Sequence, residues 1–370
     1  MNYMELDTPS LIIDQDVMME NIHHMQNFAN KNHVTLRPHT KTHKIPELAL
    51  LQEKEGAKGI AVAKTGEAEV MAAHGLKDIF IANEIVGKIK YQRIIKLLQQ
   101  GVKVTFGLDS IAQADLIEES FKVPDMIAQV LIEIEVGENR SGVIEEIDFK
   151  KLITHVQTEC PHVEVVGVFS HDGNSYNVSD LKACRENDLK AQRRTLKFAA
   201  LGKALGAKIK TVSIGSTPSL MQDFPILEGV TELRPGTYIL MDASQANAYG
   251  DQSTCAATVL ATVMSLPTLE RIILDVGAKG ITMQSRTEGI CAVKGLGYIK
   301  QFPDAVINEV FDEHAIIYNK HMHDNVKVGD KVEIVMVHIC PVMNLQENAY
   351  LVSKGEVLKT LPVLCRGKLQ

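Results

Sequence analysis

The sequence predicts an α/β protein, a (β/α)8 TIM-type barrel followed by a C-terminal, mainly-β domain. Three observations lead to this prediction. Short apolar runs alternate with longer amphipathic runs between residues 33 and 240, as strands and helices do in a barrel. After residue 241 the alternation stops, and strand-like runs joined by turns take over. The length of 370 residues is too great for one compact core and fits two domains of unequal size.

The eight runs expected to form the barrel strands are short, apolar and followed by polar residues. They cover residues 34–41, 59–64, 78–83, 103–108, 128–136, 163–170, 211–215 and 232–240. Helical patterns lie between them, at residues 66–74, 87–100, 110–120, 149–158 and 180–205. A doubly wound open sheet would also alternate, but it usually stops at about five to seven strands. The strand count therefore favours the barrel.

The C-terminal part has a different pattern. Strands are expected at residues 256–266, 271–277, 294–298, 331–338 and 355–362, with little helix between them. A short apolar run at residues 11–13 precedes a helical run at residues 16–30, and we expect that first run to join the β-domain. The predicted division is a barrel over residues 14–240 and a β-domain formed by residues 1–13 and 241–370.

Composition narrows the class of partner. The net charge of −7 gives no reason to expect nucleic acid or an anionic membrane surface. No segment approaches the roughly 18 to 20 uninterrupted apolar residues of a membrane span. The six cysteines are scattered without a CxxC pair, which is typical of reduced thiols in a cytoplasmic protein. We therefore expect a cytoplasmic protein whose partner is a small molecule.

Polar side chains end nearly every expected barrel strand, where barrel enzymes place their chemistry. These strand-end residues are Lys41, Lys64, Asn83, Glu84, Asp109, Arg140, His171, Asp172, residues 213–217 and Tyr238. Lys41 stands in the basic segment LRPHTKTHK, at residues 36–44. A lysine that is desolvated beside other cations has a lowered pKa and can form a Schiff base with an aldehyde cofactor. A basic, solvated loop is the alternative.

Two further segments contain residues that suit the binding of a phosphate and of a metal ion. The turn SIGSTPS at residues 213–219 has small residues, hydroxyls and free N–H groups that suit a phosphate, and Pro218 can open a short helix there. His338 and Cys340 are expected at the end of a β-strand, on the same face because side chains alternate. Imidazole and thiolate suit zinc with open positions, although a buried cysteine and a capped histidine would leave the same pattern.

Taken in order, these segments resemble the D-threonine aldolase and D-serine dehydratase family, which has the alanine-racemase-type fold. The matching segments are RPHTKTHK, EIEVGENRSGV (133–143), HDGNSY (171–176), SIGSTPS, ELRPGTY (232–238), DVGAK (275–279), DEH (312–314) and HICP (338–341). They span nearly the whole chain. Each segment is weak alone, but the ordered set is specific.

The resemblance implies a pyridoxal 5'-phosphate enzyme that works as a homodimer. By this resemblance Lys41 carries the cofactor, and His171 is a second catalytic residue. The remaining implied cofactor contacts are Arg140, Tyr176, Gly215, Ser216, Thr217, Arg234 and Tyr238. His338 and Cys340 match the family's ligands for a divalent metal, with zinc as first choice and manganese or magnesium as alternatives.

The implied reaction is a metal-assisted lyase reaction on D-β-hydroxy-α-amino acids, either D-serine dehydratase-like elimination or D-threonine aldolase-like cleavage. Cys340 favours the dehydratase branch. An alanine-racemase-like racemase is an alternative, but no tyrosine in residues 255–266 matches the second base of such an enzyme. The sequence also leaves open a non-catalytic cofactor-binding protein and an unrelated phosphate-binding barrel enzyme.

Overall fold

The computed structural model describes all 370 residues and contains two sheets. The first sheet has eight strands, all paired in parallel, in the order β2-β9-β8-β7-β6-β5-β4-β3. They are β2 (Thr35–Leu36), β3 (Ile60–Val62), β4 (Asp78–Glu84), β5 (Lys103–Leu108), β6 (Ala128–Glu133), β7 (Val163–Phe169), β8 (Thr211–Ile214) and β9 (Glu232–Leu233). All eight predicted strands are present, and the barrel prediction is confirmed.

The first and last barrel strands are shorter than the sequence indicated. Predicted strands 34–41 and 232–240 keep only β2 and β9, because Pro38 and Pro235 have no N–H to donate to a ladder. An isolated bridge between His39 and Ala61 links the end of β2 to β3 and closes the barrel. Lys41 consequently lies in a turn beyond β2, and a 3-10 helix, η3 (Thr237–Ile239), follows β9.

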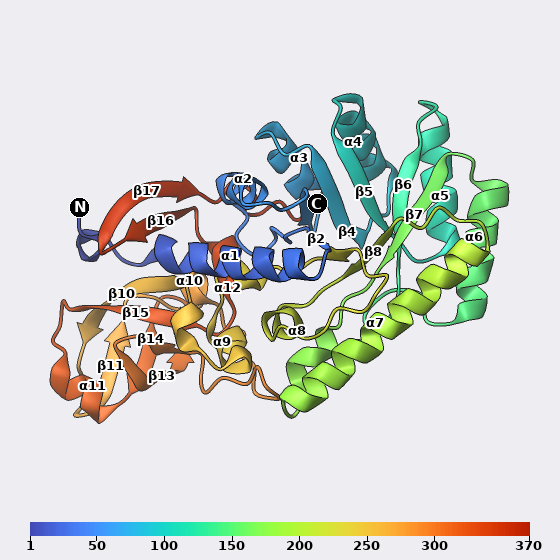
Figure 1. The fold of residues 1–370 in the computed structure, drawn as a ribbon. Helices are drawn as coiled ribbons and strands as arrows, with labels where there is room; N and C mark the ends of the chain where they lie inside the picture. The colour runs from blue at the N-terminus through green and yellow to red at the C-terminus, as the bar shows by residue number, and fades with distance from the viewer.

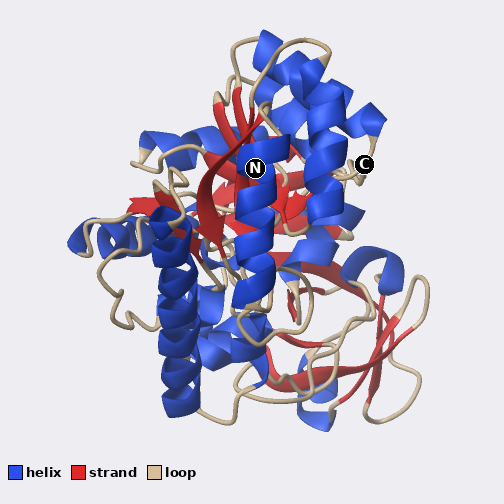
Figure 2. Ribbon diagram, turned by 90° about the vertical axis from the view of Figure 1, so that its right-hand side faces the viewer, coloured by secondary structure: helices blue, strands red, loops and turns tan.

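Helices follow the barrel strands and cover their outer surface (Figures 1 and 2). They are α2 (Pro46–Lys54), α3 (Thr65–Ala73), α4 (Lys88–Gln99), α5 (Ile111–Lys122), α6 (Glu146–Glu159) and α7 (Leu181–Ala204). The short helix α8 (Thr217–Met221) follows β8 and packs against α7 instead of covering the strands. Neighbouring helices pack through apolar side chains. For example, the rings of Phe149 in α6 and Phe198 in α7 pack edge to face, with centroids 5.1 Å apart. No helix is long and apolar enough to cross a lipid bilayer.

The second sheet has nine strands in the order β11-β14-β13-β12-β15-β10-β1-β16-β17. They are β1 (Ser10–Asp14), β10 (Ala257–Ser265), β11 (Arg271–Leu274), β12 (Gly297–Ile299), β13 (Phe302–Val310), β14 (Ala315–Tyr318), β15 (Lys331–Met336), β16 (Asn348–Ser353) and β17 (Glu356–Pro362). Because β10 pairs with both β15 and β11, six of these strands close into a second barrel. β1 pairs with β10 and β16, so the start of the chain lies in this sheet.

The predicted mainly-β domain with little helix is confirmed, although its helices were not located from the sequence. Four short helices occur there: α9 (Ala243–Tyr249), α10 (Ala278–Ile281), α11 (Lys320–Asn325) and α12 (Ile339–Leu345). None is longer than two turns, so none leaves a clear helical period in the sequence. Helix α1 (Gln15–Lys31) lies between the two parts in Figure 1. We propose the division into residues 14–240 and residues 1–13 with 241–370.

A chain of buried polar contacts fills part of the barrel interior. Arg37, directly after β2, donates to Glu232 of β9 (Nε to Oε2, 2.7 Å) and to Asp78 of β4 (Nη1 to Oδ1, 2.8 Å). The other oxygen of Glu232 accepts from Ser213 Oγ at 2.8 Å, and Ser213 in turn accepts from Arg234 Nη1 at 2.6 Å. These contacts link β4, β9 and β8 with the residue after β2. The buried carboxylate of Glu232 lies between Arg37 and Arg234.

The substitution Glu232→Gln is expected to lower the free energy of unfolding by roughly 3 kcal/mol or more, because it removes one partner of a buried ion pair. Urea titration followed by circular dichroism measures the change. Asp324→Asn is the control, because Asp324 pairs with Lys320 at the surface, and loss of such a pair costs about 0.5 kcal/mol or less. Equal effects of the two substitutions would contradict the structural importance of the buried chain.

Candidate functional site

A cavity of about 270 Å³ lies at the carboxyl ends of the barrel strands, against the second domain. Six residues predicted from the sequence line it: Lys41, Arg140, His171, Tyr176, His338 and Cys340. The lining also includes Glu138, Thr237 and Arg286, which the sequence reasoning did not single out. The barrel therefore brings strand-end residues to one place, as its topology requires.

Lys41 occupies the turn beyond β2 and is half-buried. Burial lowers the pKa of its amine, and the charges of Arg140 and Arg234 lower it further, while Cys340 acts in the opposite direction. A lowered pKa leaves more of the amine neutral and therefore nucleophilic at neutral pH. His39, two residues away, is buried, and burial holds its pKa well below the usual range.

His171 follows β7 and is oriented by two neighbours. Its Nδ1 lies 3.0 Å from Glu138 Oε2, and its ring stacks on Tyr176 with centroids 6.4 Å apart and an interplanar angle of 20°. Gly173 belongs to the 3-10 helix η2 (Gly173–Asn177), and a Cβ there would overlap the Glu138 carboxylate. A carboxylate that fixes an imidazole ring is the arrangement that a proton-transferring histidine needs.

Arg140 reaches the cavity from the segment after β6 and interacts with two carboxylates. Its Nη1 lies 3.4 Å from Glu138 Oε1, and its Nη2 lies 3.6 Å from Glu133 Oε1. Ser141 Oγ also donates to Glu133 at 2.7 Å. Burial, and then Glu133, raise the pKa of Glu84 at the end of β4 to about 9. Glu84 is therefore protonated at neutral pH, while Glu133 faces Arg140.

The turn between β8 and α8 lies beside the cavity. The N–H groups of Gly215, Ser216 and Thr217 donate to no acceptor in the chain, although Ser216 and Thr217 are only 3% and 2% exposed. Thr237, which lines the cavity, donates its N–H to Thr217 Oγ1 at 3.2 Å. Buried N–H donors without acceptors are suited to an anion, so this turn fits a phosphate group.

Two predicted cofactor contacts lie elsewhere. Tyr238 is fully buried, and its hydroxyl accepts from Gln52 Nε2 at 2.8 Å. In η3 the side chains of consecutive residues point in different directions, so Thr237 reaches the cavity wall and Tyr238 packs in the core. Arg234 lies in the barrel interior, where its Nη2 donates to the Ser170 carbonyl at 2.8 Å. Neither side chain lines the cavity.

His338 and Cys340 line the cavity, but the predicted route to that position was wrong. Strand β15 ends at Met336, His338 is the N-cap residue of α12, and Cys340 lies in its first turn. The alternation of side chains along a strand therefore does not place His338 and Cys340 together. The start of α12 brings both residues to the cavity. Burial lowers the pKa of His338 to about 4, so its imidazole is neutral, and its Nδ1 lies 2.9 Å from Gln284 Oε1.

Cys340 is held between two threonine hydroxyls from the barrel. Its Sγ lies 3.3 Å from Thr42 Oγ1 and 3.7 Å from Thr237 Oγ1. Burial raises the pKa of the thiol, while the Thr42 hydroxyl and the charge of Lys41 favour the thiolate. A neutral imidazole and a thiol in an open cavity match the donors that zinc prefers. The chemistry of this pair therefore fits a divalent metal with free positions.

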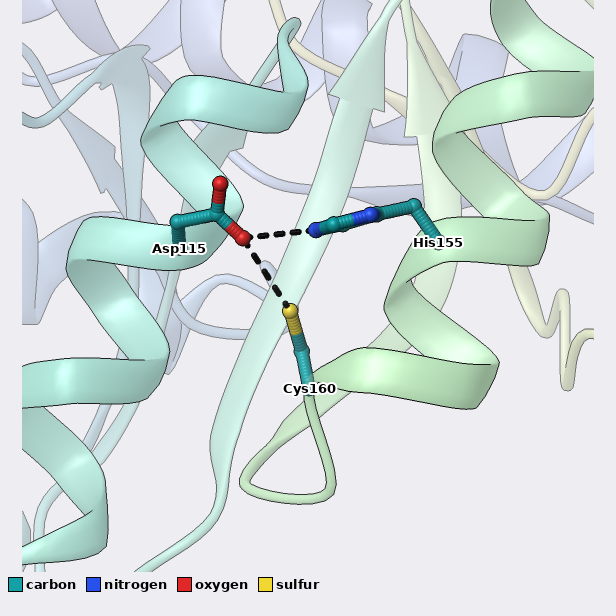
Figure 3. Close-up of side chains that lie close together, drawn as sticks. All are labelled: Asp115, His155 and Cys160. Carbon is teal, nitrogen blue, oxygen red and sulfur yellow. Dashed lines mark hydrogen bonds and ion pairs between the residues drawn. The ribbon is translucent and has the colours of Figure 1, made fainter.

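No third histidine, cysteine or carboxylate completes this pair. The group of three such side chains in the structure is Asp115, His155 and Cys160, in which Asp115 Oδ1 lies 2.6 Å from His155 Nε2 and 4.0 Å from Cys160 Sγ (Figure 3). It lies on α5 and at the end of α6, just before β7 begins, which is the opposite end of the barrel from the cavity. An ion pair and a weak hydrogen bond account for this group.

The chain matches two family models in succession. Residues 13–244 match the model described as "Alanine racemase, N-terminal domain", and residues 256–352 match "Putative serine dehydratase domain". A D-threonine aldolase of Arthrobacter sp is 31% identical over 98% of this chain and 93% of that protein. A D-threo-3-hydroxyaspartate dehydratase of Delftia sp. (strain HT23) is 30% identical over 85% of this chain and 84% of that protein.

Solved structures agree with these matches. The D-threonine aldolase from Filomicrobium marinum has a TM-score of 0.89 with 28% identity, over 100% of this chain and 98% of that one. The Delftia dehydratase has a TM-score of 0.90 with 26% identity, over 98% of both chains. An alanine racemase of Clostridium difficile 630, with a TM-score of 0.71 and 17% identity over 97% of this chain and all of that one, shares the fold. The chain therefore belongs to the D-threonine aldolase and D-serine dehydratase family, with an alanine racemase N-terminal domain and a serine dehydratase domain.

Proposed function

We propose that this protein is a pyridoxal 5'-phosphate-dependent, metal-assisted lyase that acts on D-β-hydroxy-α-amino acids. The observation that carries the proposal is the cavity itself. It collects Lys41, His171 and the His338–Cys340 pair beside a turn with three free backbone N–H groups. An amine, a proton acceptor, two soft metal donors and an anion site are the parts that this reaction needs.

The residues present fit the cofactor. Lys41 would hold its aldehyde carbon, while the N–H groups of Gly215, Ser216 and Thr217 would hold its phosphate. Arg140 and Tyr176 would contact it from the cavity wall. Arg234 and Tyr238 would support the cofactor site indirectly, from the barrel interior and from the core. When bound, pyridoxal phosphate accepts the electron pair of a bond that breaks at Cα of an amino acid.

The side chains of the cavity would move two protons. The Lys41 amine, whose pKa is lowered by burial, would take the proton from Cα during elimination. His171, held by Glu138 at 3.0 Å, would take the proton from the β-hydroxyl during cleavage of the Cα–Cβ bond. Both steps need a base at a fixed distance from the substrate, and both bases lie on the wall of one cavity.

His338 and Cys340 would hold the metal ion. Zinc is the first choice because imidazole nitrogen and thiolate sulfur are its common ligands, with manganese or magnesium as alternatives. A divalent ion at this pair supplies a Lewis acid for the β-oxygen of the substrate. A structure of a related D-threo-3-hydroxyaspartate dehydratase is of a cysteine-to-alanine variant in the metal-free form, which supports a role for cysteine in metal binding.

The choice between elimination and cleavage depends on few residues. The His-x-Cys spacing of His338 and Cys340 favours a dehydratase, and relatives of both kinds are similar to this chain. Among them is a D-serine dehydratase of Dictyostelium discoideum, 26% identical over 90% of both chains. We therefore propose dehydration as the main reaction. A homodimer stays a prediction of the family resemblance.

The purified protein, supplied with pyridoxal phosphate and zinc, is expected to release ammonia and a keto acid from D-serine, D-threonine or D-3-hydroxyaspartate. Keto acid and aldehyde are assayed separately in the same reactions, because elimination yields the first and cleavage the second. The L-enantiomers are the control and are expected to be inert. Absence of all these products from every D-substrate would exclude the proposed function.

Lys41→Ala is expected to abolish covalent attachment of the cofactor. Borohydride treatment of the wild-type protein loaded with pyridoxal phosphate should add the reduced cofactor's mass to the tryptic peptide that contains Lys41. Lys64→Ala is the matched control, since Lys64 also ends a barrel strand but lies outside the cavity lining. A label that persists in the Lys41 variant would contradict this assignment.

His338→Ala and Cys340→Ala are each expected to reduce bound zinc from about one ion per chain to well below that value, because two protein donors hold the ion. Elemental analysis after gel filtration measures the content. Cys160→Ala is the control, since Cys160 belongs to the three-residue group on the opposite side of the barrel. Full zinc content in both cavity variants would show that the ion binds elsewhere.

A further inference from the structure

Arg286 is an arginine of the cavity without a carboxylate partner. Its Nε atom is buried and has no hydrogen-bond partner, whereas Arg140, the other arginine in the lining, faces Glu133 and Glu138 at 3.6 and 3.4 Å. The Arg286 guanidinium lies over the Tyr176 ring at 4.6 Å. This contact uses the face of the guanidinium and leaves its in-plane N–H donors for another group.

The segment that carries Arg286 is fixed against the barrel. The Arg286 carbonyl accepts from the Val293 N–H at 2.8 Å, and the Ile290 N–H donates to the Val178 carbonyl at 2.9 Å. Gly289 has a φ of +69°, and a Cβ there would overlap the backbone of Asn177. These contacts hold the segment beside η2, the element that carries Tyr176, and the half-buried Arg286 lines the cavity.

The same segment also contacts the candidate metal ligand. The side-chain oxygen of Gln284, two residues before Arg286, lies 2.9 Å from His338 Nδ1. Under the proposed function His338 lies near the β-oxygen of the substrate, so the group on Cβ would face this segment. Glu138 is the only acidic residue in the cavity lining, and it already faces Arg140 and His171. Arg286 therefore has free hydrogen-bond donors and no carboxylate partner in the chain, and an anionic group of the ligand would supply that partner.

We propose that Arg286 binds a carboxylate attached to Cβ of the substrate, so that the preferred substrate is an acidic D-β-hydroxy amino acid, D-3-hydroxyaspartate or a close homologue. This inference rests on the proposed function. The same guanidinium chemistry would also suit the α-carboxylate that every amino acid carries. Substrates with and without a second carboxylate distinguish these two sources.

The test compares kcat/KM of the wild-type holoenzyme and of Arg286→Gln on D-3-hydroxyaspartate, D-serine and D-threonine. Loss of a buried charge partner is expected to reduce kcat/KM for D-3-hydroxyaspartate by at least about 100-fold, mainly through KM. The two monocarboxylate substrates should change less than about threefold, which also shows that the variant folds. Arg286→Lys should restore part of the lost activity. Arg185→Gln, on the exposed side of α7, is the control for charge alone.

A binding measurement supplements the kinetics. D-malate, a 2-hydroxy dicarboxylate, is expected to raise the melting temperature of the wild-type holoenzyme by about 3 °C or more at saturation, whereas D-lactate is not. Arg286→Gln should remove the difference between the two ligands. Equal loss of activity on all three substrates would assign Arg286 to the α-carboxylate, and unchanged kinetics on D-3-hydroxyaspartate would exclude any carboxylate role.

Failure of this inference is distinct from failure of the proposed function. A wild-type enzyme that acts on D-serine or D-threonine but not on D-3-hydroxyaspartate would overturn the inference and leave the lyase assignment intact. A wild-type enzyme inactive on all three D-substrates would overturn both. Selective loss of D-3-hydroxyaspartate activity in Arg286→Gln, with partial recovery in Arg286→Lys, would establish the subsite.

Discussion

The buried ion pair between Arg37 and Glu232 is the contact on which the active half of the molecule depends. It joins the residue that follows β2 to β9; these first and last barrel strands share only two residue pairs in their ladder. Both strands are short, although backbone hydrogen bonds from Arg37 to Leu233 and from His39 to Pro235 continue the pairing beyond them. The ion pair adds a side-chain contact at the same junction. The pair holds in place two segments that leave these strands, one leading to Lys41 and the other to Thr237.

The cavity belongs to both halves of the chain. The barrel supplies Lys41 and His171, and the second domain supplies Cys340 and Arg286. The contact is direct, because the Thr42 hydroxyl lies 3.3 Å from the Cys340 sulfur across the domain boundary. Chemistry at this site therefore depends on how the two domains pack, and a change at that boundary would affect the amine and the metal donors together.

The sequence predicts the fold best where burial is most complete. Barrel strands buried on both faces are continuous apolar runs, and all eight were identified. Three strands of the second domain, β13, β14 and β16, were not predicted. β13 contains Pro303 and Asp304, which are unfavourable in a strand, and β14 has only four residues, too few for a clear period. The short helix α12 was likewise read as the end of a strand, which gave His338 and Cys340 the right cavity for the wrong reason.

By itself, the sequence determined the barrel and identified Lys41 and the turn at residues 213–219 as candidate site residues, because these inferences depend on neighbours along the chain. Only the tertiary structure decided that Glu138 orients His171, that Tyr238 bonds to Gln52, and that Arg286 reaches the cavity without a carboxylate partner. Contacts such as that between Gln52 and Tyr238 join residues far apart in sequence, and local patterning carries no information about them. A sequence motif identifies a chemical group, whereas tertiary packing determines which residues that group contacts.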